Sequence, residues 1–222
     1  MSKSIQHLMT DENYELILDD RTKIMSCYQT LTKMDLKIDL EDDTRPMHRA
    51  LAFCRDIETS ERICRTFNNE DVKKDLLDLH KNHKNISPLN CQADHINGKS
   101  GAKDRTIKLD WLKEDAGENV CRILTNVRCL SEGVDVPSLD AVMFLHPRKN
   151  QVDVIQAVER VMRRAKGRKM GYIILPVGVS AGVSPEQALK NNKRYSVFWQ
   201  VLNALLAHDE NFSKTLNQMV LG

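Results

Sequence analysis

Short apolar runs alternate with amphipathic segments between residues 50 and 175, and this alternation constrains the fold more than any other feature of the sequence. Five runs have the length and composition of buried strands, at 50–54, 91–96, 120–124, 141–145 and 172–175. Segments with helical spacing of apolar residues lie between them, at about 58–67, 102–114 and 151–166. Thr59 and Ser60 are candidate caps at the start of the first segment, and Ile107, Trp111 and Leu112 are expected to face inward on the second. Strands that alternate with such helices form βαβ units, in which helices cover both faces of a parallel sheet. The sequence therefore predicts an α/β fold with a mostly parallel sheet.

The first 45 residues are polar and mixed. A helix is predicted from Arg21 to about Lys33, because Ile24, Tyr28 and Leu31 recur at helical spacing. The stretch LEDDTRP, residues 40–46, combines acidic charge with a proline and marks a boundary. We predict a linker or helical docking segment at 1–45 and the α/β domain at 46–180.

The residues after Pro176 change in character. A loop leads to a long helix predicted from Glu186 to about Ala207, which is apolar around much of its circumference. Such a helix is buried, either against the sheet or against a partner. Trp199 fits both interpretations, and we predict a helical extension at 181–222.

Composition excludes several classes of protein. The 222 residues are 41% hydrophobic and 29% charged, as in soluble globular proteins. No apolar run approaches the length of a bilayer span, and the first twenty residues lack the apolar core of a secretory signal. We therefore expect a cytoplasmic protein without a membrane partner.

The six cysteines never form a C-x-x-C pair, and we expect reduced core residues with no metal bound. The formal net charge is only +2, so any contact with nucleic acid has to come from a local patch. Six of the ten residues at 160–169 are basic.

This basic stretch belongs to the predicted helix at 151–166. Gln156, Arg160 and Arg163 stand at i, i+4 and i+7, so an amide and two guanidinium groups share one stripe. Valines at 154, 158 and 161 lie on the opposite side, which is expected to pack on the core. On this segment alone, an amphipathic helix with a solvated basic face is the better explanation of the pattern.

Parallel sheets bind ligands at the carboxyl ends of their strands. After the third run, Gly133 permits close approach of the backbone, and the carboxylate of Asp135 can accept hydrogen bonds from a ribose. After the second run, glycines and Ser100 can offer backbone amides to a phosphate at a helix N-terminus. His146 follows the fourth run directly.

The order of four blocks carries a family resemblance. They are ALAFCRDIETS (50–60), HINGKSGAKDR (95–105), ILTNVRCLSEGVDVPSLDAVMF (123–144) and QAVERVMRRA (156–165). This order, over about residues 48–178, resembles motifs IV, V and VI of superfamily 2 helicases and translocases, and implies the second RecA-like domain of such a motor. The tail at 195–212 resembles the segment that follows this domain in helicases of bacterial restriction-type systems.

The resemblance implies roles for individual residues. Gln156, Arg160 and Arg163 match motif VI, and both arginines would act as arginine fingers on the γ-phosphate of ATP, a role that suits a planar and always charged donor. Gly133 and Asp135 match motif V, with Asp135 near the ribose. Five residues would face nucleic acid, with DNA favoured: Arg55, His95, Gly98, Thr125 and Asn126. ATP and Mg²⁺ would be held mainly by an N-terminal RecA-like domain of the same polypeptide.

The chain departs from the family at Glu159, where motif VI usually has glycine. An i, i+4 pair of Glu159 with Arg163 is favourable by roughly a few tenths of a kcal/mol, too little to disable the arginine. A carboxylate beside a triphosphate opposes binding electrostatically, so we expect slower catalysis than a glycine version would show.

A competing motif lies at residues 93–100, where Ala93 is followed, after four residues, by Gly-Lys-Ser. This fits the loose phosphate-loop pattern and would make the chain a self-contained nucleotidase. Against it, a phosphate cradle needs small residues, whereas Asp94 would repel the ligand, and no strand ends in the acidic residue that holds magnesium. We therefore expect a motor half that is inactive alone; the alternative is a degenerate docking module without an ATPase role.

Overall fold

The computed structural model describes residues 19–34, 45–82, 86–127, 139–146, 171–178 and 195–200, together with short pieces at 9–11, 15–17 and 154–156 and residues 184, 187 and 203. A five-stranded sheet forms the centre, in the order β4-β5-β3-β6-β7, and every pairing in it is parallel. Its strands are β3 (Arg49–Phe53), β4 (Asn90–Ile96), β5 (Val120–Asn126), β6 (Ala141–Phe144) and β7 (Tyr172–Ile174). Two short strands, β1 (Met9–Asp11) and β2 (Glu15–Ile17), form a separate antiparallel pair.

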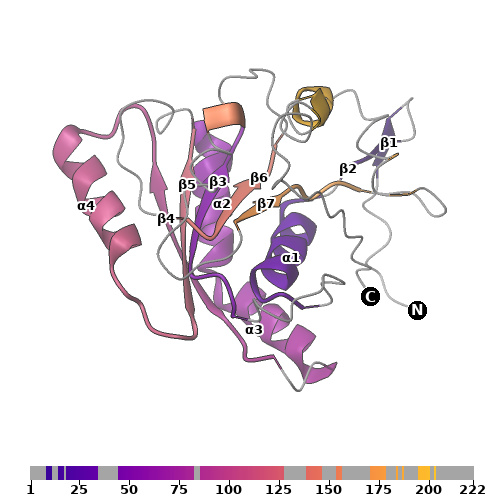
Figure 1. The fold of residues 1–222 in the computed structure, drawn as a ribbon, viewed down its shortest axis with the longest axis horizontal. Coiled ribbons are helices and arrows are strands. Elements are labelled where there is room, and N and C mark those ends of the chain that lie inside the picture. Colours follow the sequence, from indigo (N-terminus) through magenta and orange to yellow (C-terminus); the bar gives the residue numbers. More distant parts are fainter. Residues whose placement is uncertain are drawn as a thin grey trace.

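Helices cover both faces of the sheet, as predicted. They are α1 (Asp20–Leu31), α2 (Ile57–Phe67), α3 (Glu70–Leu79), a 3-10 turn at His80–Asn82, and α4 (Ala102–Lys113). Figure 1 shows α4 on one side of the sheet and α1 with α3 on the other. This arrangement confirms the RecA-like α/β fold.

The alternation of side chains along each strand produces two cores. On β3, Ala50 and Ala52 face the core under α1, α2 and α3, while Leu51 and Phe53 face the core under α4. Strand β6 repeats this alternation. Because both faces are covered, the strands read as continuous apolar runs, and this is why they were detectable in the sequence.

Phe144 of β6 is the centre of the core on the α4 side. It is fully buried, stacks on Phe53 with ring centroids 5.1 Å apart, and meets the edge of Phe198 at 4.2 Å. Phe198 lies in the short helical piece at 196–200. The described part of the C-terminal region therefore packs on the sheet, and Trp199 is partly buried against the same core.

Helix α1 is anchored in the opposite core. Ile24, Tyr28 and Leu31 are fully buried there, as their spacing predicted, and the hydroxyl of Tyr28 receives the backbone N–H of Leu89 at 3.1 Å. The helix therefore docks on the sheet of its own chain. The domain boundaries at 45 and 180 stay predictions, since residues 35–44 and 179–183 lie outside the described residues.

The free edge of β4 is occupied at its middle by a side chain. The amide of Asn68 donates to the carbonyl of Ala93 at 2.8 Å, and its oxygen accepts from the N–H of Ala93 at 3.0 Å. Both backbone groups of Ala93 are thus paired without a neighbouring strand.

Two local predictions were wrong. Thr59 and Ser60, considered as caps of the helix near residue 58, lie inside α2, and the N-cap is Asp56. Ile107 was expected to face inward on α4 but is 57% exposed, since Leu109 and Leu112 form the buried face. Among the helices that the structure describes, none combines the length and hydrophobicity that crossing a bilayer requires.

Replacing Asp56 with alanine should lower the free energy of unfolding by about 1 kcal/mol at neutral pH, because its carboxylate receives the N–H of Thr59 at 2.8 Å. The hydrogen bonds from Thr59 and Arg55 hold the pKa of Asp56 well below its usual range. Because the pKa of Asp56 is lower in the folded protein than in the unfolded chain, its ionised carboxylate stabilises the fold at pH values above the unfolded pKa of about 3.9. This stabilisation is lost as the pH falls toward the folded pKa.

Urea unfolding of the two proteins at several pH values measures this effect, and the difference should shrink below about pH 4. Asp56→Asn is the matched control, because asparagine keeps the acceptor but does not titrate. Equal stability of the alanine variant at neutral pH would show that the cap contributes nothing.

Candidate nucleic-acid and nucleotide edge

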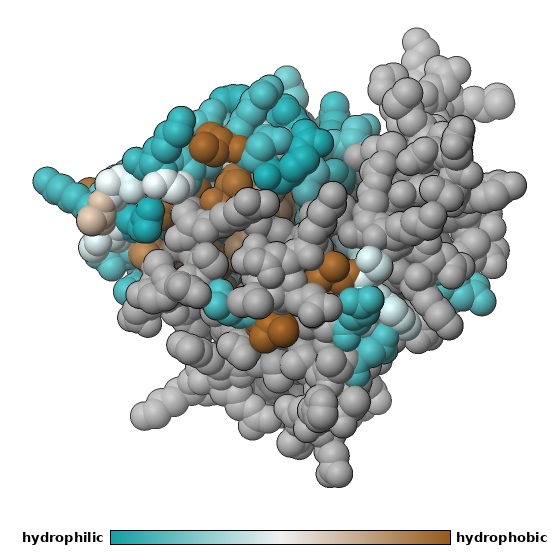
Figure 2. Space-filling view, turned by 90° about the horizontal axis from the view of Figure 1, so that it is seen from above, coloured by the Kyte–Doolittle hydropathy of each residue, from teal (hydrophilic) through white to brown (hydrophobic). Residues whose placement is uncertain are grey.

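The carboxyl ends of three adjacent strands bring several predicted site residues to one edge. The backbone N–H of Cys54 donates to the carbonyl of Asn126 at 3.0 Å, and that of Leu145 donates to the carbonyl of Phe53 at 3.2 Å. Asn126 therefore ends β5 beside Arg55 and His146, which follow the neighbouring strands β3 and β6. In Figure 1 the strands rise toward this edge, and Figure 2 looks down on it, with hydrophilic described residues gathered along one side. Because strand order reverses here, this edge is where such sheets place ligands.

Thr125 and Asn126, predicted to contact nucleic acid, are fully buried at the end of β5. The Thr125 hydroxyl lies 3.1 Å from the carbonyl of Ser60, and the Asn126 amide donates to the carbonyl of Ala52 at 3.3 Å. Their observed contacts therefore hold the strand ends and α2 together. The contact with nucleic acid stays a prediction for both residues. Asn126 Oδ1 is buried and has no hydrogen-bond partner among the described residues.

His95 lies beside Thr125 in a hydrogen-bonded network at the end of β4. Asn97 Oδ1 accepts from the N–H of Lys99 at 2.8 Å, which orients the Asn97 amide to donate to His95 Nε2 at 3.0 Å. The ring therefore carries its proton on Nδ1 and donates to the Ser60 hydroxyl at 2.8 Å. Burial lowers the pKa of His95, so the ring is neutral at physiological pH and orients its neighbours without contributing charge.

Arg55 and Gly98 are exposed at the same edge. The Arg55 guanidinium pairs with Asp56 at 2.8 Å, and the Arg55 side chain is 67% exposed to solvent. Gly98 lies in the turn before α4, where a Cβ would meet no atom within 4 Å. The N-cap Gly101 makes no side-chain hydrogen bond, so the first N–H groups of α4 lack a side-chain acceptor from this cap.

Of the three motif VI residues Gln156, Arg160 and Arg163, the structure describes only Gln156. Val154 is fully buried, as predicted for the packed side, and Gln156 is helical with its Oε1 buried and without a hydrogen-bond partner among the described residues. Arg160 and Arg163, together with Gly133, Asp135 and Glu159, lie outside the described residues. Their roles stay predictions.

The structure disfavours the competing phosphate loop. Residues 93–96 are not a loop but the second half of β4, in register with Ile123–Asn126 of β5. A cradle for phosphates needs a run of backbone amides that curves around the ligand, whereas these residues are extended. Among the described residues, no group of three or more His, Cys, Asp and Glu side chains is placed to hold a metal ion.

Lys23 is a residue of this edge that the sequence did not reveal. It lies on α1, and its Nζ is 3.4 Å from Nε2 of His146. The sequence pattern placed α1 in a linker or docking segment, so nothing connected Lys23 with the strand ends. His146 was visible as the residue after a strand, but its partner was not.

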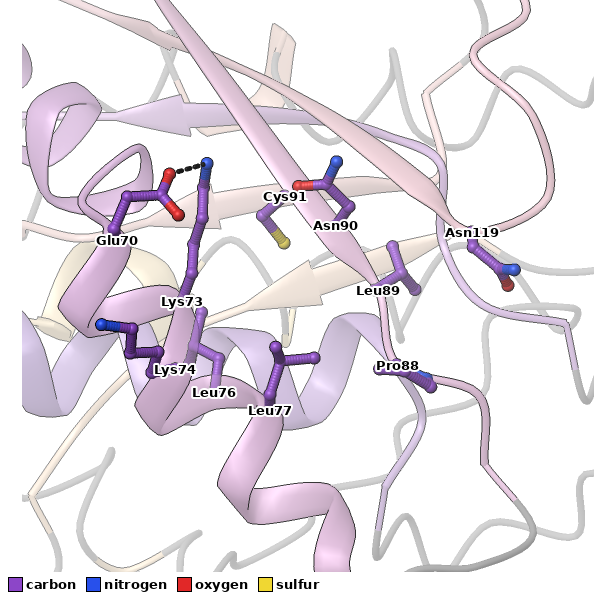
Figure 3. A pocket seen from close by; sticks show the side chains of 10 residues that line it. All are labelled: Glu70, Lys73, Lys74, Leu76, Leu77, Pro88, Leu89, Asn90, Cys91 and Asn119. Carbon is purple, nitrogen blue, oxygen red and sulfur yellow. Dashed lines mark hydrogen bonds and ion pairs between the residues drawn. The ribbon is translucent and has the colours of Figure 1, made fainter.

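A cavity of about 380 Å³ lies at the opposite end of the sheet, between α3 and the beginnings of β4 and β5. Figure 3 shows Leu76 and Leu77 from α3 and Leu89 and Cys91 from the strand side around it. None of the predicted site residues lines this cavity. The two ends of the sheet therefore differ, with an apolar cavity at one and the polar strand ends at the other.

A parallel sheet of this order, with polar groups at its carboxyl edge and helices on both faces, defines a RecA-like domain. The sequence matches the family described as Helicase conserved C-terminal domain over residues 27–165, and the chain belongs to this family.

Three relatives extend the comparison. A solved structure of the ATP-dependent Type ISP restriction-modification enzyme LlaBIII bound to DNA is 38% identical with a TM-score of 0.66, over 86% of this chain and 12% of that chain. A protein named "Putative helicase 22", from Sulfolobus islandicus filamentous virus, is 30% identical over 82 residues, which are 37% of this chain and 14% of that protein. A "Probable helicase" of African swine fever virus is 40% identical over 58 residues, 26% of this chain and 7% of that protein. The chain therefore spans only a small part of each relative.

Proposed function

We propose that this chain is the second motor domain of an ATP-dependent DNA helicase or translocase of a restriction-type system. The observation that carries the proposal is the position of Arg55, His95 and Asn126 at the carboxyl ends of the neighbouring strands β3, β4 and β5, in a chain 38% identical to a DNA-bound restriction-modification enzyme. Binding to DNA would be mainly to phosphates and dependent on salt.

The residues of this edge fit a nucleotide. The side-chain oxygen of Gln156, which has no hydrogen-bond partner within the described part of the chain, is the kind of buried acceptor that a ligand donor satisfies. Gly133 and Asp135 would hold the ribose, and Arg160 and Arg163 would face the terminal phosphate. When bound, ATP with Mg²⁺ supplies the transferable phosphoryl group and neutralises part of its charge. The arginines would then stabilise the charge that develops during hydrolysis.

The test compares two proteins. The 222-residue chain alone should hydrolyse ATP no faster than buffer, because the phosphate loop and the magnesium ligands would come from another domain. The longer polypeptide that contains this chain and an N-terminal RecA-like domain should hydrolyse ATP, and DNA should stimulate it. A steady-state phosphate-release assay measures both rates. Appreciable turnover by the 222-residue chain would contradict the proposal that it is one of two motor domains and inactive alone. A lack of stimulation by DNA would contradict the proposed DNA-dependent function.

A further inference from the structure

Three basic residues from separate elements lie near one another at the ends of β3 and β6, and two of them, Lys23 and His146, are in contact. Lys23 comes from α1, Arg55 from the loop after β3, and His146 from the end of β6. Lys23 Nζ lies 3.4 Å from His146 Nε2, and both cations act on the imidazole, since Lys23 and Arg55 each lower the pKa of His146. We call these three residues the Lys23 cluster.

Two acidic residues lie near the Lys23 cluster, and each is engaged by a side chain other than Lys23. Asp20 accepts from Arg62 Nε at 2.6 Å, and Asp56 caps α2 and pairs with Arg55. Within the described part of the chain, the ammonium of Lys23 has one polar contact, the imidazole of His146. A neutral imidazole cannot balance an ammonium, so the positive charge of Lys23 is not matched by a contacting carboxylate.

Burial makes this arrangement costly without an anion. It lowers the pKa of Lys23, although Asp20 opposes the effect, and it lowers the pKa of His146 to about 4. The imidazole is therefore neutral at physiological pH, while Nδ1 of His146 is buried with no hydrogen-bond partner in the described residues. An anion beside Lys23 would supply the missing charge. Because Nε2 of His146 accepts from the Lys23 ammonium, Nδ1 carries the proton of the neutral ring, and an oxygen of the anion or of a bound water would accept from it.

We propose that Lys23 and His146, with Arg55 at the exposed side, form a binding position for a phosphate group. The cluster lies at the carboxyl edge of a parallel sheet, where phosphate-bearing ligands bind in such folds. The phosphate belongs either to the DNA backbone or to a nucleotide. This inference rests on the proposed function and adds two contacts to it, Lys23 and His146.

The DNA arm measures binding of a labelled oligonucleotide to the 222-residue chain by fluorescence anisotropy at several salt concentrations. Lys23→Met should weaken binding about tenfold at low salt, and it should reduce the slope of log affinity against log salt by about one. Lys23→Arg should keep the slope of the wild type. Lys74→Met is the matched control, because it removes the same charge from an exposed side chain of α3 at the opposite end of the sheet.

The nucleotide arm uses the longer polypeptide and compares the affinity of ATP for the same variants by equilibrium dialysis. A loss of ATP affinity with unchanged DNA binding assigns the phosphate to the nucleotide, and the opposite pattern assigns it to DNA. A third measurement titrates His146 by NMR in the 222-residue chain with and without inorganic phosphate. A bound phosphate should raise the pKa of His146 above about 4, because an anion favours the imidazolium.

The proposal is overturned if wild-type protein binds DNA and ATP while Lys23→Met binds both as tightly as Lys74→Met does, with no effect of phosphate on His146. Failure of the wild type itself to bind DNA or ATP would contradict the proposed function instead. In that case the phosphate titration of His146 still decides whether the cluster binds an anion.

Discussion

Replacing Arg163 with alanine in the polypeptide that carries this chain should lower DNA-stimulated ATP hydrolysis about a thousandfold or more. An arginine that reaches the terminal phosphate of ATP stabilises charge that develops only during hydrolysis, so the turnover number falls much more than the affinity for ATP. The sequence places Arg163 at i+7 from Gln156 in the helix predicted at 151–166, and Val154, on the side predicted to pack, is buried. The same spacing predicts a comparable role for Arg160.

Steady-state ATPase assays with separate values of kcat and KM measure this effect. Arg65→Ala is the control, since Arg65 is an exposed arginine on α2 with only a distant pairing to Glu61 at 4.0 Å. The variant Glu159→Gly belongs to the same series and should raise turnover, because it removes a carboxylate that the match to motif VI would place near the phosphates. If Arg163→Ala retains turnover within a few-fold of the wild type, the chain does not supply an arginine finger and the docking-module alternative gains support.

Phe144→Ala should cost about 3–5 kcal/mol of unfolding free energy. Its ring is fully buried and contacts both Phe53 and Phe198, so alanine removes apolar area and leaves a cavity between the sheet and the C-terminal helical piece. Phe144→Leu keeps most of the volume and should cost considerably less.

Urea unfolding of the 222-residue chain measures both losses. A double-mutant cycle with Phe198→Ala should show a coupling of about 0.5–1.5 kcal/mol between the two rings. A loss below about 1 kcal/mol for Phe144→Ala would mean that the site collapses around the smaller side chain, in conflict with the close packing of this core. A coupling of zero would separate the C-terminal helical piece from the stability of the sheet.

The strands were predictable because burial on both faces leaves a continuous apolar run, a signal that needs no tertiary information. The N-cap of α2 and the buried face of α4 were harder to predict from the sequence. Asp56 caps α2 because the backbone is still extended at that residue, whereas Thr59 and Ser60, equally good capping types, already lie inside the helix. Helix α4 offers two apolar faces, with Ile107 and Trp111 on one and Leu109 and Leu112 on another, and only the position of the sheet decides between them.

The candidate site shows the same division. Adjacent parallel strands end at one edge, so the proximity of Arg55, His95 and Thr125 followed from the sequence. The burial of Thr125 and Asn126 did not, because it depends on how α2 covers the strand ends. Lys23 is more than a hundred residues from His146, and only the docking of α1 brings them together.

The side-chain amide of Asn68 has a consequence for how copies of this protein meet. Strand β4 is the outer strand of the sheet, and outer strands can template pairing with a foreign strand. Because Asn68 engages both backbone groups of Ala93, an incoming strand would have to displace two hydrogen bonds at the middle of β4 before it could extend the ladder. The Asn68 side chain therefore opposes edge-to-edge pairing of β4 with another copy of the protein, and it does so through the hydrogen bonds of a neutral side chain rather than through charge or a proline.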